Sequence, residues 1–554
     1  MSYPYENLKP FTLPKLLDRS IELYGSRELS GKVDEESMTY SEFGVKVQHM
    51  VKMLEINNIS KGDKVALLGE NMPNWGVAYF AITYIGAVVV PILPDFHKSD
   101  VHHILRHSEA KGVFVSKKFE QTIKECEDSE LGFAINLEEL KHIKDLKNLK
   151  FIDKVKQLAK KALNDSTVNE DDMASLIYTS GTTGHSKGVM LSHKNLVTNA
   201  MSSHSILKIL PTDVFLSILP LAHTFECTVG LIVPILHGSS IKYISKAPTP
   251  SVLLKAFKSV RPTMMLSVPL VIEKIYKSKI LSQINSSFVT RNLYKVPFFR
   301  KLINKKAGQK LIETFGGRIR FYGVGGAGIS PYVEEFLYEA KFPYIVGYGL
   351  TETAPLLCGT PINKPTKLRS TGPALYGVDL KIKNKNPKTG EGEICAKSPS
   401  VMMGYYKDEE KTKEVMEDGW FLTGDLGYID EDGYLFISGR SKNVIIGPAG
   451  ENIYPEQIES IINKQEYVLD SLVLDVDSKL VAKIHLDYEL LDKKFKNLPQ
   501  QQIKEKIKQI LENIRIEVNA NVSSFSKITK TLEQEEPFIK TPTKKIKRYL
   551  YVVK

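Results

Sequence analysis

The chain is poor in cysteine and tryptophan. Its 554 residues include only two tryptophans and four cysteines, and no two cysteines form a Cys-x-x-Cys pair. This spacing argues against a disulfide framework and against the common zinc sites, and it is typical of a reducing compartment. The first residues show no basic region followed by an apolar one, so no secretory signal is recognised. We therefore expect a cytoplasmic protein.

Long hydrophobic runs are also nearly absent. One stretch, Trp75–Pro94, is about long enough to cross a bilayer, but it contains two glycines and two prolines. Its second half, from Val88 onward, is rich in β-branched residues. We therefore interpret it as a buried helix that leads into a buried strand, and we expect no membrane span.

The charge balance shows no strong excess of one sign. Lysine and arginine number 75 and aspartate and glutamate 64, so the net charge is +11. Over this length such an excess is too mild for a nucleic-acid-binding protein, but it suits small polyanionic ligands or an anionic membrane surface. The content of 42% hydrophobic and 25% charged residues is ordinary for a globular protein and excludes disorder.

Helix-like and strand-like segments alternate along most of the chain, with short apolar strands at residues 64–69, 112–115 and 242–244. This alternation predicts an α/β fold with mainly parallel sheets. The length exceeds that of one core, so we expect a large N-terminal domain of layered sheets and helices, residues 1–439. A small, mobile C-terminal α+β domain, residues 440–554, should follow. In it, apolar residues between Ile503 and Val518 recur at helical spacing.

The strongest local motif is Tyr178–Val189, YTSGTTGHSKGV. Glycines allow close backbone approach to a ligand, hydroxyls can donate to phosphate oxygens, and Lys187 adds positive charge. The motif follows an apolar strand, which is where a phosphate-holding loop is expected. It is not a Walker motif, because Gly184 lies three residues before Lys187. Taken alone, it could equally be a flexible surface loop.

Further pieces of a nucleotide site follow. GYGLTET, residues 347–353, places an aromatic ring beside a carboxylate and two hydroxyls. An aromatic ring can stack on a purine, and a carboxylate can hold Mg²⁺. GVGGAG, residues 323–328, could accommodate a flat ring, and Asp425 could bind a ribose diol. Taken singly, each piece could be a turn or the edge of a core.

Together these motifs resemble the adenylate-forming superfamily of acyl-CoA synthetases, luciferases and peptide-synthetase adenylation domains. The matching segments, in order, are YTSGTTGHSKG, GGAGIS, YGLTET, GWFLTGDLG, GRSKNVI, GENIYPEQIE and TPTKKIKR. The resemblance implies two steps. A carboxylate attacks the α-phosphate of ATP to give an acyl-adenylate and pyrophosphate, and a thiol, usually that of coenzyme A, then displaces AMP.

The resemblance also implies a set of site residues. Mg²⁺ would be held by Thr179 and Glu352, and the pyrophosphate end of ATP by Ser180, Gly181, Thr182, Thr183, Gly184 and Lys187. Adenine would lie against Gly326, Ala327 and Tyr348, the α-phosphate against Thr351, and the ribose against Asp425 and Arg440. Gly349 would also belong to the cofactor-binding residues. Lys545 would contact the reacting carboxylate, with Glu352 and Thr351 beside it. Lys442 would be the hinge of the small domain, and Gly450 would line the path of coenzyme A.

Two positions depart from the pattern of the family. Ser186 replaces the usual proline before Lys187, which changes the rigidity of the loop more than its chemistry. Lys544 stands where relatives often have glycine, so Lys544 and Lys545 both remain candidates for the catalytic lysine.

The sequence indicates the acid substrate and the thiol acceptor less clearly than it indicates the nucleotide site. LPLAHTFE, residues 219–226, resembles the long-chain fatty acid branch, and His223 would border the acyl site, although a lone histidine is often structural. The basic, aromatic-bearing stretch from Lys277 to Lys310 resembles an insertion of that branch. It is either an exposed helix pair or a peripheral membrane contact.

We therefore expect an AMP-forming long-chain fatty acid–CoA ligase that uses ATP, Mg²⁺ and coenzyme A. Two alternatives stay open. The acceptor could be acyl carrier protein, or the chain could be a non-catalytic relative that binds lipid or nucleotide. No nucleic-acid partner is expected.

Overall fold

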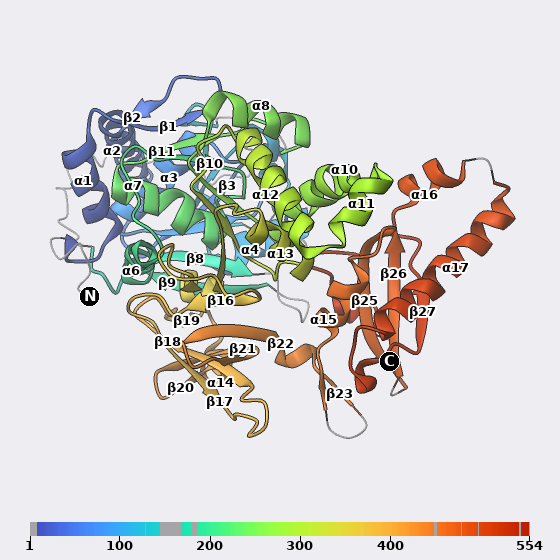
Figure 1. Ribbon diagram of the computed structural model, residues 1–554. Coiled ribbons are helices and arrows are strands. Elements are labelled where there is room, and N and C mark those ends of the chain that lie inside the picture. Colours follow the sequence, from blue (N-terminus) through green and yellow to red (C-terminus); the bar gives the residue numbers. More distant parts are fainter. Residues whose placement is uncertain are drawn as a thin grey trace.

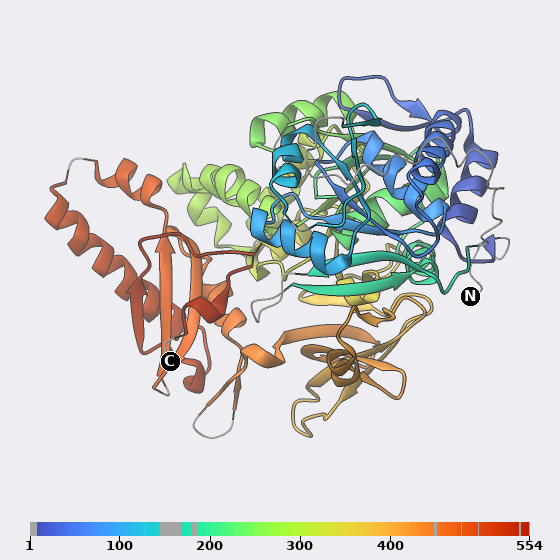
Figure 2. The ribbon, with the colours of Figure 1, turned by 180° about the vertical axis from the view of Figure 1, so that it is seen from behind.

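The computed structural model describes residues 8–127, 129–143, 168–179, 186–246, 248–447, 451–477, 479–496, 498–541 and 545–552. These residues form a large N-terminal body and a smaller C-terminal domain, which lies beside the body in orange and red in Figure 1 and is seen from behind in Figure 2. The predicted α/β architecture, with a small α+β domain at its end, is confirmed.

The first sheet of the N-terminal body has eight strands in the order β19-β9-β8-β4-β3-β5-β6-β7. Its strands are β3 (Lys64–Leu68), β4 (Val88–Ile92), β5 (Gly112–Val115), β6 (Phe133–Asn136), β7 (Lys141–His142), β8 (Met173–Thr179), β9 (Lys187–Ser192) and β19 (Gly404–Tyr405). The strands from β8 to β6 are parallel, whereas β7, β9 and β19 are antiparallel to their neighbours.

The second sheet also has eight strands, in the order β15-β14-β13-β12-β10-β11-β1-β2. Its strands are β1 (Glu28–Lys32), β2 (Met38–Thr39), β10 (Val214–Ser217), β11 (Ser240–Tyr243), β12 (Met264–Ser267), β13 (Phe321–Val324), β14 (Tyr344–Gly349) and β15 (Leu356–Gly359). All pairs are parallel except those of the two edge strands, β2 and β15.

Helices lie between these two sheets and on their outer faces. The central layer contains α3 (Pro73–Tyr84), which contacts β1 of one sheet and β3 and β4 of the other. Its nine residues from Trp75 to Thr83 are all buried, which explains why the helix is apolar on every side. The expected helix and strand within Trp75–Pro94 are therefore confirmed as α3 and β4. No helix within the described ranges is both long and apolar enough to cross a bilayer.

The other helices of the body are α1 (Leu13–Tyr24), α2 (Tyr40–Ile56), α4 (Lys98–Ser108), α5 (Glu120–Lys124), α6 (His193–Ser202), the π-helix η4 (Glu226–Ile232), α7 (Val233–His237), α8 (Pro250–Val260), α9 (Pro269–Ile275), the π-helix η5 (Tyr276–Leu281), α10 (Ser282–Asn285), α11 (Phe288–Tyr294), α12 (Pro297–Thr314), α13 (Pro331–Glu339) and the 3-10 turn η6 (Thr351–Thr353). The stretch from Lys277 to Lys310, predicted as an insertion, covers most of η5, α10, α11 and most of α12, and in Figure 1 α10 and α11 extend toward the C-terminal domain.

A third, antiparallel sheet follows. It consists of β16 (Ser370–Pro373), β17 (Asp379–Lys383), β18 (Gly392–Lys397), β20 (Met416–Glu417), β21 (Trp420–Ile429) and β22 (Tyr434–Arg440), with α14 (Glu409–Val415) beside it. Because β22 ends at Arg440, the predicted boundary between the domains coincides with the end of a strand.

The C-terminal domain contains η7 (Ser441–Asn443), β23 (Ile445–Ile446), β24 (Asn452–Ile453), α15 (Pro455–Ile462), β25 (Val468–Val476), β26 (Lys479–Leu486), α16 (Tyr488–Phe495), α17 (Gln500–Asn519), β27 (Lys530–Glu533) and η9 (Arg548–Leu550). The predicted amphipathic helix is α17, which buries Ile507, Leu511, Ile514 and Val518. Its apolar stripe packs into a core separate from that of the N-terminal body.

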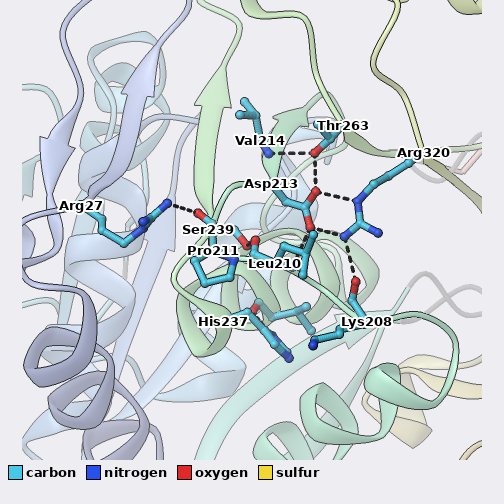
Figure 3. Close-up of polar contacts among 11 residues, drawn as sticks. Arg27, Lys208, Leu210, Pro211, Asp213, Val214, His237, Ser239, Thr263 and Arg320 are labelled. Atoms are coloured by element: carbon cyan, nitrogen blue, oxygen red, sulfur yellow. Dashed lines mark hydrogen bonds and ion pairs between the residues drawn. The ribbon is translucent and has the colours of Figure 1, made fainter.

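An ion pair between buried Asp213 and partly exposed Arg320 joins the amino ends of three strands in the second sheet (Figure 3). Asp213 precedes β10 and accepts hydrogen bonds from Arg320 Nε at 2.7 Å, Thr263 Oγ1 at 2.8 Å and the Leu210 amide at 2.7 Å. Thr263 precedes β12 and Arg320 precedes β13. This Asp213 cluster therefore aligns the parallel strands at the end opposite their carboxyl termini.

Candidate active site

Several of the predicted site residues lie at the carboxyl ends of parallel strands. His223 follows β10, Gly326 and Ala327 follow β13, and Glu352 follows β14, all in the second sheet. Thr179 ends β8 of the first sheet. Loops at the carboxyl ends of parallel strands are where open α/β sheets bind ligands. The topology thus brings together motifs that are far apart in sequence.

Asp425 lies at the centre of one polar cluster. It is cross-strand partner to Arg440 in the β21–β22 pair, and their side chains form an ion pair of 2.6 Å between Oδ1 and Nε. The Tyr348 hydroxyl donates to Asp425 Oδ2 at 2.7 Å. Burial raises the pKa of Asp425, while Arg440 and Tyr348 act in the opposite direction. The carboxylate is therefore held in one orientation at the edge of the site.

Glu352 forms a second cluster with two residues of the first sheet. The Tyr405 hydroxyl donates to Glu352 Oε1 at 2.9 Å, and the Lys187 ammonium lies 5.2 Å from the centre of the Tyr405 ring. Desolvation is the main cause of the lowered pKa of Lys187, and nearby Lys411 and Lys442 lower it further. Lys187 pairs with Thr179 across the β8–β9 ladder, so the two lie at the base of the same hairpin.

Tyr405 is a site residue that the sequence analysis did not identify. It follows Gly404, whose φ is +144° and whose added Cβ would lie 2.9 Å from Thr412 Cγ2. A glycine before two tyrosines was the available sequence signal. That pattern does not reveal that Tyr405 contacts a carboxylate more than fifty residues earlier in the chain.

The GGAG loop is open on the side where a flat ring was expected. Gly326 has φ +84°, and the nearest atom to an added Cβ would be Val268 Cγ1 at 3.8 Å. Ala327 and Gly328 are exposed. Gly349 has a different reason to be glycine, because an added Cβ would collide with the carbonyl oxygen of Pro355.

Lys545 of the C-terminal domain reaches the same place. Its side chain is still solvent-accessible, but enough protein surrounds it that desolvation lowers its pKa, with the Arg440 charge as the next cause. The negative charges of Asp425 and Glu352 act on it in the opposite direction. Its amide donates to Thr541 Oγ1 at 3.1 Å, which ties the backbone of Lys545 to Thr541.

His223 lies close enough to Lys545 for that charge to affect it. Desolvation, followed by the Lys545 charge, lowers the pKa of His223 to about 4. The ring is therefore neutral at pH 7. Its Nδ1 accepts a hydrogen bond from the Phe225 amide at 3.2 Å, which assigns the ring proton to Nε2.

A narrow apolar cavity begins beside these loops. Its lining includes Phe225 and Val229 after β10, Val324 of β13, and Gly347 of β14. Its volume is about 20 Å³, about enough for one water molecule. The cavity is lined almost entirely by apolar atoms, and it would have to widen to admit an alkyl chain.

Two more of the predicted residues are described, and the rest are not. Thr351 is half-buried in η6, and Lys442 is exposed in η7, where its charge acts on Lys187. Ser180, Gly181, Thr182, Thr183, Gly184 and Gly450 lie outside the described residues, as does Lys544. Within the part that is described, no group of three or more histidine, cysteine or acidic residues could form a metal cluster by itself.

Known proteins are similar to this chain in sequence and in fold. The sequence is 30% identical over 497 residues to long chain acyl-CoA synthetase 6, peroxisomal, of Arabidopsis thaliana, covering 83% of this chain and 70% of the relative. It is 27% identical to fatty acyl-CoA synthetase A of Dictyostelium discoideum, covering 96% and 87%.

A solved structure shows the same fold. The structure of O-succinylbenzoate coenzyme A synthetase from Bacillus subtilis with ATP and magnesium has a TM-score of 0.73 at 23% identity and covers 96% of this chain and 98% of that one. Residues 18–406 match the family described as AMP-binding enzyme. The chain therefore belongs to the AMP-binding enzyme family.

Proposed function

We propose that this protein activates a long-chain fatty acid with ATP and transfers the acyl group to coenzyme A. The first step forms a bond between the fatty acid carboxylate and the α-phosphorus of ATP and breaks the bond to pyrophosphate. The second step forms the thioester and releases AMP. The observation that carries the proposal is the meeting of Lys545, Glu352 and the Asp425–Arg440 pair beside an apolar cavity. The long-chain acyl-CoA synthetases among the relatives support the same substrate class.

In the first step, the protein must bring two anions together and stabilise the charge that develops on phosphorus. Lys545 supplies a cation from the C-terminal domain, and Lys187 supplies another from the β8–β9 hairpin. Preorganised charges of this kind act most strongly where water is largely excluded. Asp425 and Arg440 are assigned to the ribose, Gly326, Ala327 and Tyr348 to adenine, and Thr351 to the α-phosphate.

Magnesium is assigned to Glu352 and Thr179. The donor set fits, because both residues offer oxygen atoms, and Mg²⁺ takes its remaining ligands from waters and substrate phosphates. When bound, the metal would neutralise phosphate charge. Tyr405 holds Glu352 through a hydrogen bond to Oε1, which leaves Oε2 for this role.

The apolar cavity is assigned to the acyl chain. Each methylene that leaves water for such a site contributes about 0.8 kcal/mol, so a long chain gains more than a short one. The neutral His223 ring, two residues before Phe225 of the cavity wall, is assigned to the carboxyl end of the acid, and its Nε2 proton can donate to a carboxylate oxygen. The length of the chain is set by how far the cavity opens.

Coenzyme A is the proposed acceptor, with Gly450 beside its path and Lys442 as the hinge that lets the C-terminal domain turn. Acyl carrier protein is the second candidate, because the basic surface would suit an acidic partner. The intact set of Lys545, Glu352 and Asp425 favours catalysis over simple binding. We propose a cytoplasmic enzyme that makes peripheral contact with a membrane.

Pyrophosphate release tests the proposal. The purified chain is given ATP, Mg²⁺ and a panel of fatty, aromatic and short acids, with coenzyme A, acyl carrier protein or neither. We expect release with long-chain acids and thioester only with coenzyme A. Thioester on acyl carrier protein alone would identify that protein as the acceptor. A chain that forms neither AMP nor bound acyl-AMP with any acid would contradict the proposal.

A further inference from the structure

Almost all of the net charge of the protein lies in one segment. Residues 274–312 contain ten lysines and arginines and no aspartate or glutamate, whereas the whole chain has a net charge of +11. Eight of these cations are exposed and take part in no ion pair among the described residues: Lys274, Lys279, Arg291, Lys295, Lys301, Lys305, Lys306 and Lys310. The other two, Lys277 and Arg300, have partners within the protein.

The same segment exposes large apolar side chains. Phe288 is 71% exposed, Phe298 67% and Val289 64%, and Leu293, Val296, Phe299 and Leu302 are exposed as well. The rings of Phe298 and Phe299 lie 5.5 Å apart. We call residues 288–302, which comprise α11, the following turn and the start of α12, the insertion corner. Contiguous exposed apolar surface of this kind marks an interaction site on a soluble protein.

The insertion corner is anchored from behind. On α12, Asn304, Gly308 and Leu311 are buried, and an added Cβ on Gly308 would collide with the carbonyl oxygen of Ala340. The Tyr294 hydroxyl donates to Asn304 Oδ1 at 3.0 Å, which ties α11 to α12. Because the inner face of α12 is already packed and α11 buries none of its residues, the exposed phenylalanines have no place in the core. Their outward position is therefore built into the fold.

We propose that the insertion corner docks this protein on an anionic lipid bilayer. The phenylalanine and aliphatic side chains enter the interface, and the surrounding lysines and arginines face the lipid head groups. Aromatic and aliphatic side chains bordered by cations are the features that bind a helix to a membrane surface. A second copy of the chain is a poorer occupant, because a symmetric contact would place two strongly basic surfaces against each other. The role of docking rests on the proposed function, since long-chain fatty acids partition into bilayers.

Vesicle sedimentation of the full chain, without substrates, tests the proposal. We expect binding to vesicles of phosphatidylcholine mixed with phosphatidylserine and at least tenfold weaker binding to phosphatidylcholine alone. Raising the salt from about 0.05 M to about 0.5 M should also release the protein, because exposed charges are then screened. Absence of binding to the anionic vesicles would overturn the proposal.

Matched variants separate the insertion corner from other basic surfaces. Phe298→Ser combined with Phe299→Ser should weaken binding at least tenfold, as should Lys301→Gln with Lys305→Gln and Lys306→Gln. The triple glutamine variant of Lys504, Lys506 and Lys508, three exposed lysines of α17, should bind like the wild type. Equal binding by all variants, or loss with the α17 variant alone, would contradict the assignment.

Two further measurements distinguish the alternatives. Light scattering would detect a dimer, and a dimer lost in the double serine variant would show that the insertion corner is an interface between copies instead. Pyrophosphate release with a long-chain fatty acid supplied in detergent solution, without vesicles, should be unchanged in the corner variants. Failure of that assay in the wild type would contradict the proposed function but not the vesicle result.

Discussion

Lys545 is the residue on which the proposed first half-reaction depends most directly. We expect Lys545→Ala to slow acyl-adenylate formation about 100- to 1000-fold, because it removes a preorganised cation from the reacting phosphate. Lys544→Ala should change the rate by less than about threefold if the role belongs to Lys545. Pyrophosphate release in the first turnover measures both. The reverse order of effects would assign the role to Lys544.

The sequence predicted the identities of the candidate site residues better than it predicted the contacts between them. Motifs pointed to Asp425 and Arg440, but not to their 2.6 Å ion pair, which depends on the register of β21 and β22. The sequence pattern did not indicate Tyr405, because its partner, Glu352, follows a strand of the other large sheet. A contact of this kind is set by how the two sheets pack, and no local spacing encodes it.

Among the elements, the Asp213 cluster gives a prediction about stability. Asp213 is almost fully buried while Arg320 is partly exposed, so Asp213→Asn should destabilise the N-terminal body by about 2 kcal/mol. Thermal unfolding should show this as a lower transition temperature. Glu512→Gln, which removes an exposed ion pair within α17, is the control and should leave unfolding nearly unchanged.

The effect of Asp213 should depend on pH. Burial alone would raise the pKa of Asp213, but Arg320, the Leu210 amide and Thr263 together bring it below its usual value. A carboxyl whose pKa is lower in the folded state stabilises the fold above its unfolded pKa of about 3.9. That contribution is lost as the pH falls through the folded pKa. The difference in the free energy of unfolding between wild type and Asp213→Asn should therefore be largest at pH 6 and should decrease below about pH 4. A difference that grows on acidification would contradict this origin.

The π-helix η5 provides a contact between the domains. Lys277 Nζ donates to the Asn463 carbonyl at 2.6 Å, at the end of α15, and lies 3.5 Å from the Val468 carbonyl. Both acceptors belong to the C-terminal domain that carries Lys545. This contact therefore stabilises the arrangement in which Lys545 faces Glu352.

We expect Lys277→Met to slow acyl-adenylate formation about tenfold, since a charged hydrogen bond contributes about 1.5 kcal/mol or more to the arrangement that it supports. Thioester formation from supplied acyl-adenylate should change little. Lys279→Met is the matched control, because Lys279 is exposed on the same helix. Equal loss in both half-reactions, or the same loss in the control, would show that Lys277 does not act through the position of the domain.

Local patterns predicted several elements well. The apolar run from Trp75 became α3 and β4, and the apolar spacing after Ile503 became α17. The local pattern of apolar residues is enough to predict these elements, because the residues that each element buries are apolar. The third sheet was not anticipated as a separate antiparallel layer, since one of its edge pairs joins β16 to β22 across more than sixty residues. Such pairing has no local signature.

The two domains meet in an arrangement suited to the first half-reaction. Lys545 is near Asp425 and Glu352, whereas a thiol acceptor would need its own approach to the acyl group. One active site therefore has to serve two different nucleophiles, the fatty acid carboxylate and then the thiol. A turn of the C-terminal domain about η7 would withdraw Lys545 after the adenylate forms. The exposed position of Lys442 in η7 is consistent with a hinge, because little packing would have to break there.

Lys442→Pro tests this movement. Proline fixes φ near −65° and would restrict the turn of the chain after β22. Since the present arrangement already suits adenylation, we expect thioester formation from supplied acyl-adenylate to fall at least tenfold more than pyrophosphate release. Lys442→Ala is the control: it removes the charge that acts on Lys187 but leaves the backbone free, so it should spare the thioester step. Equal losses in both half-reactions for Lys442→Pro, or no loss, would mean that the C-terminal domain does not turn at this residue.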